Sequence, residues 1–176
     1  MTRLLVVCTA NLVRSPFAAA ALTRAIPRYY SIDSAGLAAA EGEEIPPDVL
    51  QDMRRYVLDL SKHRSRQVTP SDVRRSALIL GMTEAHRDAL QTMVPAATPR
   101  TFTFTEFVRL AETVPRLSEH DGLDKFVAAV HRQRPRIEAA VAREDIDDPL
   151  GRSAGRMRSC IDELANLAER VGARFH

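Results

Sequence analysis

A short apolar run that ends in a cysteine constrains this chain more than any other feature. Residues 4–7 are all aliphatic, without polar alternation, and Cys8 follows them directly. Such a run predicts a central parallel strand that is covered on both faces. From Ser15 the chain continues as SPFAAAALTRA, which predicts a helix over residues 15–25 with Ser15 as its cap and Pro16 at its first position. The sequence therefore predicts a strand, a short loop and a helix.

The loop between this strand and this helix predicts an anion-binding site. Backbone N–H groups of the loop and of the first helical turn converge there, and the helix dipole adds partial positive charge. Thiols in such surroundings ionise readily, so we expect Cys8 to be a thiolate nucleophile. Arg14 offers a planar fork that can hold two phosphoryl oxygens at once. A buried structural cysteine beside a solvated arginine is the alternative, but it leaves the combination of Cys8, Asn11, Arg14, Ser15 and Pro16 unexplained.

The segment CTANLVRSP resembles the signature of the low-molecular-weight protein tyrosine phosphatases of the bacterial type. That signature is a cysteine, five residues, an arginine, then serine or threonine and proline, close to the N-terminus. Further segments match the family in the family's order: DSAG at 33–36, LSKHRSR at 60–66, LILGMT at 78–83 and DPLG at 148–151. The resemblance implies hydrolysis of phosphotyrosine in a protein substrate, without a metal or a cofactor.

The resemblance also implies roles for individual residues. Cys8 attacks phosphorus and forms a cysteinyl phosphate, while Arg14 binds the equatorial oxygens. Ser34 is expected to hydrogen-bond the loop residue Asn11, and Ser15 to hydrogen-bond the thiolate. The substrate-binding loop is expected to comprise Thr9, Ala10, Asn11, Leu12, Val13, Arg14 and Ser15.

Asp148 is the expected general acid. The leaving oxygen of a phenolic phosphate ester must be protonated, and a carboxylic acid on a mobile loop can supply the proton. Pro149 restricts Asp148 to extended conformations. A turn rich in aspartate is the alternative interpretation. The resemblance favours catalysis, because the family carries an Asp-Pro at this distance before its C-terminal helix; Asp147 is the nearest competitor.

Several residues depart from the family pattern. Ala10 stands where glycine is common, so a positive φ at this position would be strained. Val13 replaces the second cysteine of many members. Leu150 stands where an aromatic side chain is common, and Leu12 and Leu37 are candidate pocket walls. We therefore expect a weaker aromatic clamp on the substrate.

The rest of the chain predicts one α/β domain over residues 1–176, with four parallel strands and helices on both faces. Beyond the first strand, strands are expected at 29–34, 76–82 and 101–104. Further helices are expected at 47–58, 83–94, 105–111 and 153–171, and helical structure within 118–144.

Three smaller sequence features have structural interpretations. His63, Arg64 and Arg66, in a basic segment, are expected to hold neighbouring loops rather than to catalyse. Cys160 lies on the apolar stripe of the last helix and is expected to pack in the core. Gly172 is expected to end that helix.

Composition limits the partners and the compartment. The 176 residues carry 25 Lys and Arg against 23 Asp and Glu, a formal net charge of +2. This balance argues against nucleic acid or membrane as a general partner. No apolar run is long enough for a membrane span or a signal peptide, and two cysteines favour a reducing compartment. We therefore expect a cytoplasmic protein.

Three alternatives to a tyrosine phosphatase remain open at this point. An arsenate reductase on the same fold would need resolving cysteines, and only Cys160 is available. An arginine phosphatase usually has threonine after the loop asparagine, where this chain has Leu12. A phosphate-binding module without turnover would keep Cys8 and Arg14 but need no acid.

Overall fold

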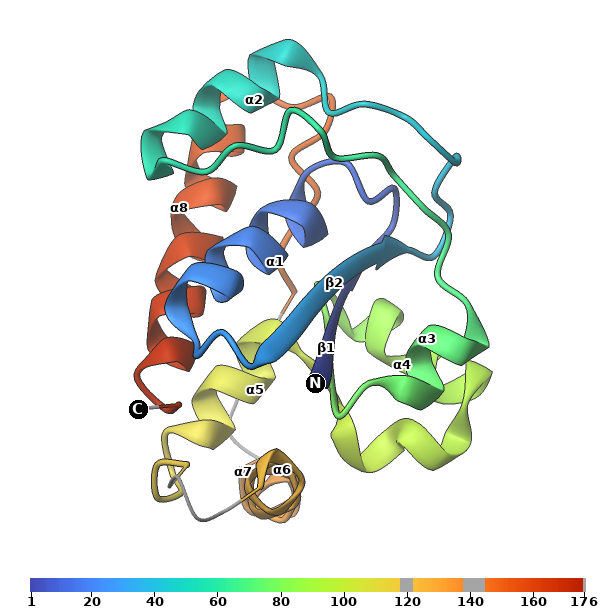
Figure 1. Cartoon of the computed structure of the whole chain (residues 1–176), viewed down its shortest axis with the longest axis vertical. Helices are drawn as coiled ribbons and strands as arrows, with labels where there is room; N and C mark the ends of the chain where they lie inside the picture. Colours follow the sequence, from blue (N-terminus) through green and yellow to red (C-terminus); the bar gives the residue numbers. More distant parts are fainter. Residues whose placement is uncertain (118–121, 138–144, 176) are drawn as a thin grey trace.

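The central strand of the sheet is β1 (Thr2–Cys8), whose apolar sequence suits burial on both faces. The computed structural model describes residues 1–117, 122–137 and 145–175. In these residues the sheet has four parallel strands in the order β2-β1-β3-β4 (Figure 1). The other strands are β2 (Tyr30–Gly36), β3 (Leu78–Gly81) and β4 (Thr101–Thr103). The predicted four-stranded parallel sheet is confirmed.

The register aligns the carboxyl ends of three strands. Cys8 lies opposite Gly36 of β2, and Val7 lies opposite Gly81 of β3. The loop that follows β1 therefore lies at the same edge as the ends of its two neighbours. Open α/β sheets bind their ligands at this edge.

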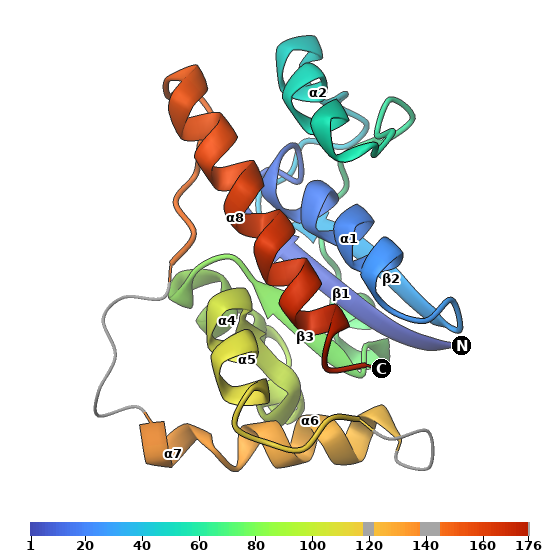
Figure 2. The same cartoon turned by 90° about the vertical axis from the view of Figure 1, so that its left-hand side faces the viewer.

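Helices cover both faces of the sheet. One face carries α1 (Arg14–Ala25), α5 (Phe104–Ala111) and α8 (Ala154–Gly172), and the other carries α3 (Pro70–Arg75) and α4 (Glu84–Met93). The remaining helical segments are α2 (Pro47–Met53), η1 (Arg54–Tyr56), η2 (Pro95–Arg100), α6 (Leu123–His131) and α7 (Arg134–Ile137). Figure 2 shows α8 running along α1, with α6 and α7 at one end of the molecule beyond α5.

Side chains of β1 alternate between two cores. Leu4 and Val6 pack in the core under α1 and α8, whereas Leu5 and Val7 pack in the core under α3 and α4. All four side chains are buried. The uninterrupted apolar run of β1 is therefore explained, because each face of the strand meets a helical layer.

Two predicted helix starts behave differently. Thr83 caps α4 as predicted, since its hydroxyl accepts from the His86 N–H at 3.2 Å. The prediction that Ser15 caps α1 is wrong: Val13 holds the cap position and Ser15 lies inside the first turn. The Ser15 side chain turns toward Cys8 instead.

Two further predictions need correction at helix ends. The helix expected over 47–58 ends at Met53, and Val57 adopts a left-handed conformation (φ 57°) with 85% of its surface exposed. Gly172 is the last residue of α8 rather than a stop beyond it. A Cβ at Gly172 would lie 2.7 Å from the Ala25 carbonyl oxygen, so glycine here permits the close approach of α8 to α1.

The segment 118–144 is described only in part. Residues 122–137 contain α6 and α7, so the predicted helical structure is confirmed there, with Phe126, Val127 and Val130 buried. The prediction for residues 118–121 and 138–144 lies outside the described residues. The short helix α3 was not predicted, because its six residues carry too little apolar periodicity.

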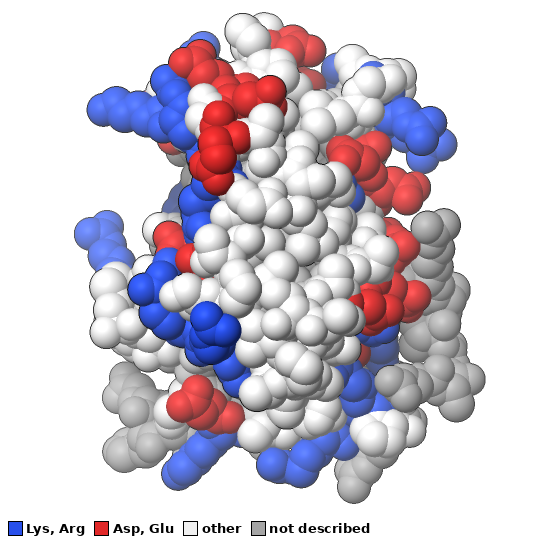
Figure 3. Space-filling view, turned by 90° about the vertical axis from the view of Figure 1, so that its right-hand side faces the viewer, with Lys and Arg blue, Asp and Glu red and all other residues white. Residues whose placement is uncertain are grey.

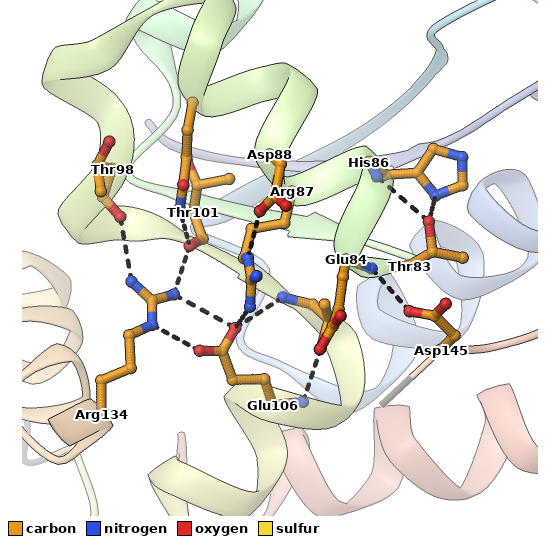
Figure 4. A network of polar contacts seen from close by, with 12 residues as sticks. Thr83, Glu84, His86, Arg87, Asp88, Thr98, Thr101, Glu106, Arg134 and Asp145 are labelled. Carbon is orange, nitrogen blue, oxygen red and sulfur yellow. Dashed lines mark hydrogen bonds and ion pairs between the residues drawn. The ribbon is translucent and has the colours of Figure 1, made fainter. Parts of the chain in front are cut away.

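A buried ion-pair network joins α5 to α4 and α7 (Figure 4). Glu106 is buried and its carboxylate pairs with Arg134 (2.5 Å) and Arg87 (3.5 Å). The same carboxylate accepts from the Thr103 N–H at 3.1 Å and so closes a capping box at the start of α5. A buried carboxylate is tolerated here because each oxygen has a charged partner.

The surface carries charges of both signs. Figure 3 shows one face, on the side of α3 and α4, where red and blue groups lie around an uncharged centre. Among the described residues, no helix has both the length and the apolar character needed to cross a bilayer.

Candidate active site

The loop after β1 is fixed by the chain that leaves β2. Leu37 N–H donates to the Cys8 carbonyl (2.9 Å), and Ala38 N–H donates to the Thr9 carbonyl (3.0 Å). The two segments approach so closely at Gly36 that a Cβ there would lie 2.3 Å from the Thr9 carbonyl oxygen. Glycine at position 36 is therefore required by space, and it brings the end of β2 against the loop.

The Cys8 sulfur receives polar contacts from two directions. Asn11 N–H donates to Sγ at 3.3 Å, and Ser15 Oγ lies 3.0 Å from it. The amide of Asn11 in turn donates to Ser15 Oγ at 2.9 Å, and the Ser15 hydrogen has two acceptors within reach, the sulfur and the Ala35 carbonyl oxygen at 3.3 Å. The thiol is 2% exposed at the start of α1. These contacts suit a sulfur that carries negative charge.

Asn11 gives the loop its shape. It adopts a left-handed conformation (φ 57°), which asparagine tolerates better than most residues. Its amide donates to Ser34 Oγ at 2.9 Å and accepts from the Arg66 backbone N–H at 3.0 Å. The positive φ lies at Asn11 and not at Ala10, so alanine in the loop carries no such strain.

His63 contacts the same loop, as expected of a structural residue. Its Nε2 lies 2.8 Å from the Asn11 carbonyl oxygen. Burial, the main cause, lowers the pKa of His63. Arg64, beside it in the basic segment, pairs with Glu44 at 2.6 Å.

Arg14 spans the loop and reaches the segment before α8. Nη1 donates to the Ile146 carbonyl at 3.0 Å, while Nη2 contacts Asp148 Oδ2 at 2.5 Å and Thr9 Oγ1 at 3.4 Å. The guanidinium is 3% exposed, whereas the Asp148 side chain is 39% exposed. The fold thus brings Cys8, Arg14 and Asp148 together from both ends of the chain.

Asp147 is the other candidate acid. It is exposed, and its carbonyl oxygen lies 3.9 Å from the Cys160 thiol. Cys160 itself is buried in the core, as predicted, and burial is the main cause that raises its pKa to about 12. Of the two candidate acids, the structure therefore places Asp148, not Asp147, against Arg14.

The acid loop, residues 145–151, is anchored to the start of α4. Ile146 N–H donates to the Met82 carbonyl at 2.8 Å. Asp145 Oδ1 accepts from the Glu84 N–H at 2.7 Å, as Figure 4 shows. The connection from β3 to α4 therefore fixes the acid loop.

His86 is a site residue that the sequence analysis missed. Its Nε2 lies 2.9 Å from Thr9 Oγ1 in the loop after β1, and its Nδ1 lies 2.9 Å from Thr83 Oγ1. Burial, followed by the nearby charge of Arg14, lowers the pKa of His86 to about 4. A histidine in the first turn of a helix after a strand's carboxyl end was the available signal.

The candidate pocket walls flank the loop from opposite faces of the sheet. Leu12 and Leu150 are partly buried against the core under α1 and α8, and Leu37 against the core under α3 and α4. Their contact with a substrate stays a prediction.

Comparisons with known proteins find phosphatases. Residues 3–115 match the family model described as low molecular weight phosphotyrosine protein phosphatase. The probable low molecular weight protein-tyrosine-phosphatase EpsP of Ralstonia nicotianae is 34% identical over 77% of this chain and 96% of its own. A protein-arginine-phosphatase of Geobacillus stearothermophilus is 30% identical over 98% of this chain and 95% of its own. Among solved structures, the YwlE arginine phosphatase from Geobacillus stearothermophilus superposes with a TM-score of 0.73 and 29% identity, covering 98% of this chain and 92% of that one.

Proposed function

The chain belongs to the low-molecular-weight phosphotyrosine protein phosphatase family, and on this premise we propose that it hydrolyses phosphotyrosine in a protein substrate through a cysteinyl phosphate. One observation carries the proposal. The Cys8 sulfur lies at the start of α1 with a backbone N–H and a hydroxyl directed at it, 3.3 and 3.0 Å away. A sulfur so placed can act as an anionic nucleophile toward a bound phosphoryl group.

In the first step, Cys8 attacks phosphorus as the bond to the phenolic oxygen breaks. Arg14 and the N–H groups of residues 9–15 stabilise the charge on the equatorial oxygens. A phosphoryl group that binds Nη2 of Arg14 takes the place of the Asp148 carboxylate, which contacts that nitrogen at 2.5 Å. Asp148 in its protonated form then delivers a proton to the leaving oxygen.

In the second step, water attacks the phosphorus of the cysteinyl phosphate. Asp148, now a carboxylate, takes a proton from this water, and the S–P bond breaks. The Ser15 hydroxyl, 3.0 Å from the sulfur, stabilises the departing thiolate. Inorganic phosphate leaves, and the original site is restored.

Phosphoarginine is the second candidate substrate. The relative named a protein-arginine-phosphatase aligns with 98% of this chain, whereas EpsP aligns with 77%. Leu12, which follows the loop asparagine, argues against this candidate. An arsenate reductase is disfavoured because Cys160, the only other cysteine, is buried and carries a raised pKa.

Matched peptides that carry phosphotyrosine or phosphoarginine test the proposal. We expect the wild type to release phosphate from the phosphotyrosine peptide at least about tenfold faster, and Cys8→Ser to release none from either. The reverse preference would establish the arginine phosphatase. Binding of inorganic phosphate without turnover of either peptide would instead identify a phosphate-binding module.

A further inference from the structure

The first turn of α4 contacts both loops of the candidate active site. On one side, Glu84 N–H binds Asp145 and so holds the acid loop. On the other, the His86 ring reaches Thr9, the residue after the nucleophile. Figure 4 shows Thr83, His86 and Asp145 gathered at this helix start. The proposed mechanism gives His86 no role.

We assign the ring proton of His86 to Nε2 from the contacts of the ring. Thr83 Oγ1 already accepts from the His86 backbone N–H at 3.2 Å, so its own hydrogen is free to donate to Nδ1, 2.9 Å away. With Nδ1 as an acceptor, the ring proton lies on Nε2 and is directed at Thr9 Oγ1. This assignment uses the Thr83 hydroxyl and both ring nitrogens.

Thr9 links the His86 ring to the guanidinium of Arg14. Its Oγ1 accepts from His86 Nε2 at 2.9 Å and from Arg14 Nη2 at 3.4 Å. Two donors at one oxygen fix the threonine rotamer. A phosphoryl group that binds Nη2 displaces Asp148 from this nitrogen. The contact of Nη2 with Thr9 remains.

We propose that His86 is a positioning residue for the phosphatase reaction, which holds the Thr9 hydroxyl and through it the Nη2 arm of Arg14. The inference rests on the proposed function of the site. It needs a neutral ring, since a protonated ring would lose its acceptor for Thr83 and place a cation beside Arg14. The charged groups that act on the ring are Arg14 from α1, and Asp145 and Asp148 from the acid loop; burial and Arg14 keep it neutral at pH 7.

Two polar substitutions separate the two ring contacts. The glutamine amide of His86→Gln can occupy the place of Nε2 and donate to Thr9, whereas the shorter amide of His86→Asn can reach only Thr83. With para-nitrophenyl phosphate, we expect His86→Asn to lose about 10- to 100-fold in kcat/KM and His86→Gln to stay within about fivefold of wild type. Inorganic phosphate binding, measured by calorimetry, should weaken in the same order.

A double-mutant cycle tests whether the effect passes through Thr9. If it does, His86→Asn combined with Thr9→Val is no worse than Thr9→Val alone. The inference is overturned if both His86 variants, shown to be folded by circular dichroism, lose activity and phosphate affinity equally. It is also overturned if the loss in the double mutant is the product of the losses in His86→Asn and Thr9→Val. A wild type that binds phosphate but does not turn over the ester would refute the proposed function alone, because the calorimetric order still tests His86. A wild type that does not bind phosphate would refute both.

Discussion

At the scale of single residues, Asn11 illustrates how much of the site depends on one side chain. Its amide contacts Ser15 and Ser34, its carbonyl groups receive Arg66 and His63, and its backbone takes the left-handed conformation. These contacts hold the loop around Cys8 from several sides. Preorganised donors cost no rearrangement during the reaction, which is the physical advantage of such a loop.

Arg14→Lys should lower turnover by about 10²- to 10³-fold while the fold is unchanged. Lysine keeps the charge but cannot replace the donors that reach Ile146 and the phosphoryl oxygens together. The measurement is kcat on para-nitrophenyl phosphate beside circular dichroism. Arg158→Lys, an exposed change on α8, is the matched control and should stay near wild type. Near-normal turnover in Arg14→Lys would refute the assigned role.

Asp148→Ala should slow esters with poor leaving groups far more than activated ones. The missing proton matters most when the leaving oxygen is basic, so phosphotyrosine hydrolysis should fall by about 10²- to 10⁴-fold. Rates over a series of aryl phosphates measure this as a steeper dependence on leaving-group pKa. Asp147→Ala, the exposed neighbour, is the control and should remain parallel to wild type. A steeper dependence in Asp147→Ala would exchange the two roles.

Peroxide should inactivate the protein in a way that thiols reverse poorly. Val13 replaces the neighbouring thiol of many family members, and the Cys160 thiol is buried with a raised pKa, so a sulfenic acid at Cys8 has no ready partner. We expect inorganic phosphate to protect and Cys160→Ser to behave like wild type. Recovery with dithiothreitol, together with a Cys8 to Cys160 disulfide in mass spectra, would contradict this.

The sequence predicted the members of the site that share a local motif. Cys8, Asn11, Arg14 and Ser15 lie within eight residues of chain, and the strand, loop and helix around them bring them together as expected. His86 could not be assigned in this way, because its contact with Thr9 spans 77 residues and depends on the parallel register of β1 and β3. A histidine in the first turn of a helix is a local signal, but it does not reveal a partner 77 residues away.

At the scale of helices and strands, amphipathic periodicity predicted the long elements and failed at short ones. The stripe on α8 is buried as expected, whereas α3 has only six residues and the helix predicted over 47–58 gives way after Met53 to the short helical turn η1. Short segments are shaped by tertiary contacts that override propensity. Gly172 illustrates the same limit, because glycine is needed there for the close approach of Ala25 in α1 and not to end α8.

Gly172→Ala should destabilise the fold by about 1 to 3 kcal/mol, because the added methyl group overpacks the contact with Ala25. Gly155→Ala in the same helix is the matched control. Its nearest neighbour would lie 3.8 Å from the new Cβ, so it should be neutral or stabilising by up to about 1 kcal/mol. Urea unfolding measures both free energies. Equal effects of the two changes would contradict close packing of α8 on α1.

At the scale of the whole molecule, residues from distant parts of the chain meet at the carboxyl edge of the sheet. The loop after β1, the start of α4 and the acid loop are linked by Arg14, His86 and Asp145. Because these contacts exist only in the folded chain, a titratable group among them links protonation to global stability. In this set, burial is the main cause that lowers the pKa of His86 to about 4.

Acid should therefore destabilise the wild type more than His86→Gln. In the unfolded chain a histidine has a pKa near 6.5, so between pH 6.5 and 4 the unfolded state binds a proton that the folded state excludes. The contribution of His86 to the unfolding free energy is thus fully present above about pH 6.5 and is lost as the pH falls toward 4. Glutamine does not titrate and removes this contribution.

The measurement is urea unfolding of both proteins by circular dichroism at pH values from 4 to 8. His63, whose pKa is also lowered, and the carboxylates titrate in both proteins, so the difference between the two unfolding free energies isolates His86. We expect this difference to be constant above pH 7 and to shift steadily against the wild type below pH 6.5. A difference that stays constant from pH 4 to 8 would mean that His86 takes up its proton as readily in the folded state as in the unfolded one. The His86 ring would then be protonated below about pH 6.5 in the folded state as well, which would contradict its lowered pKa.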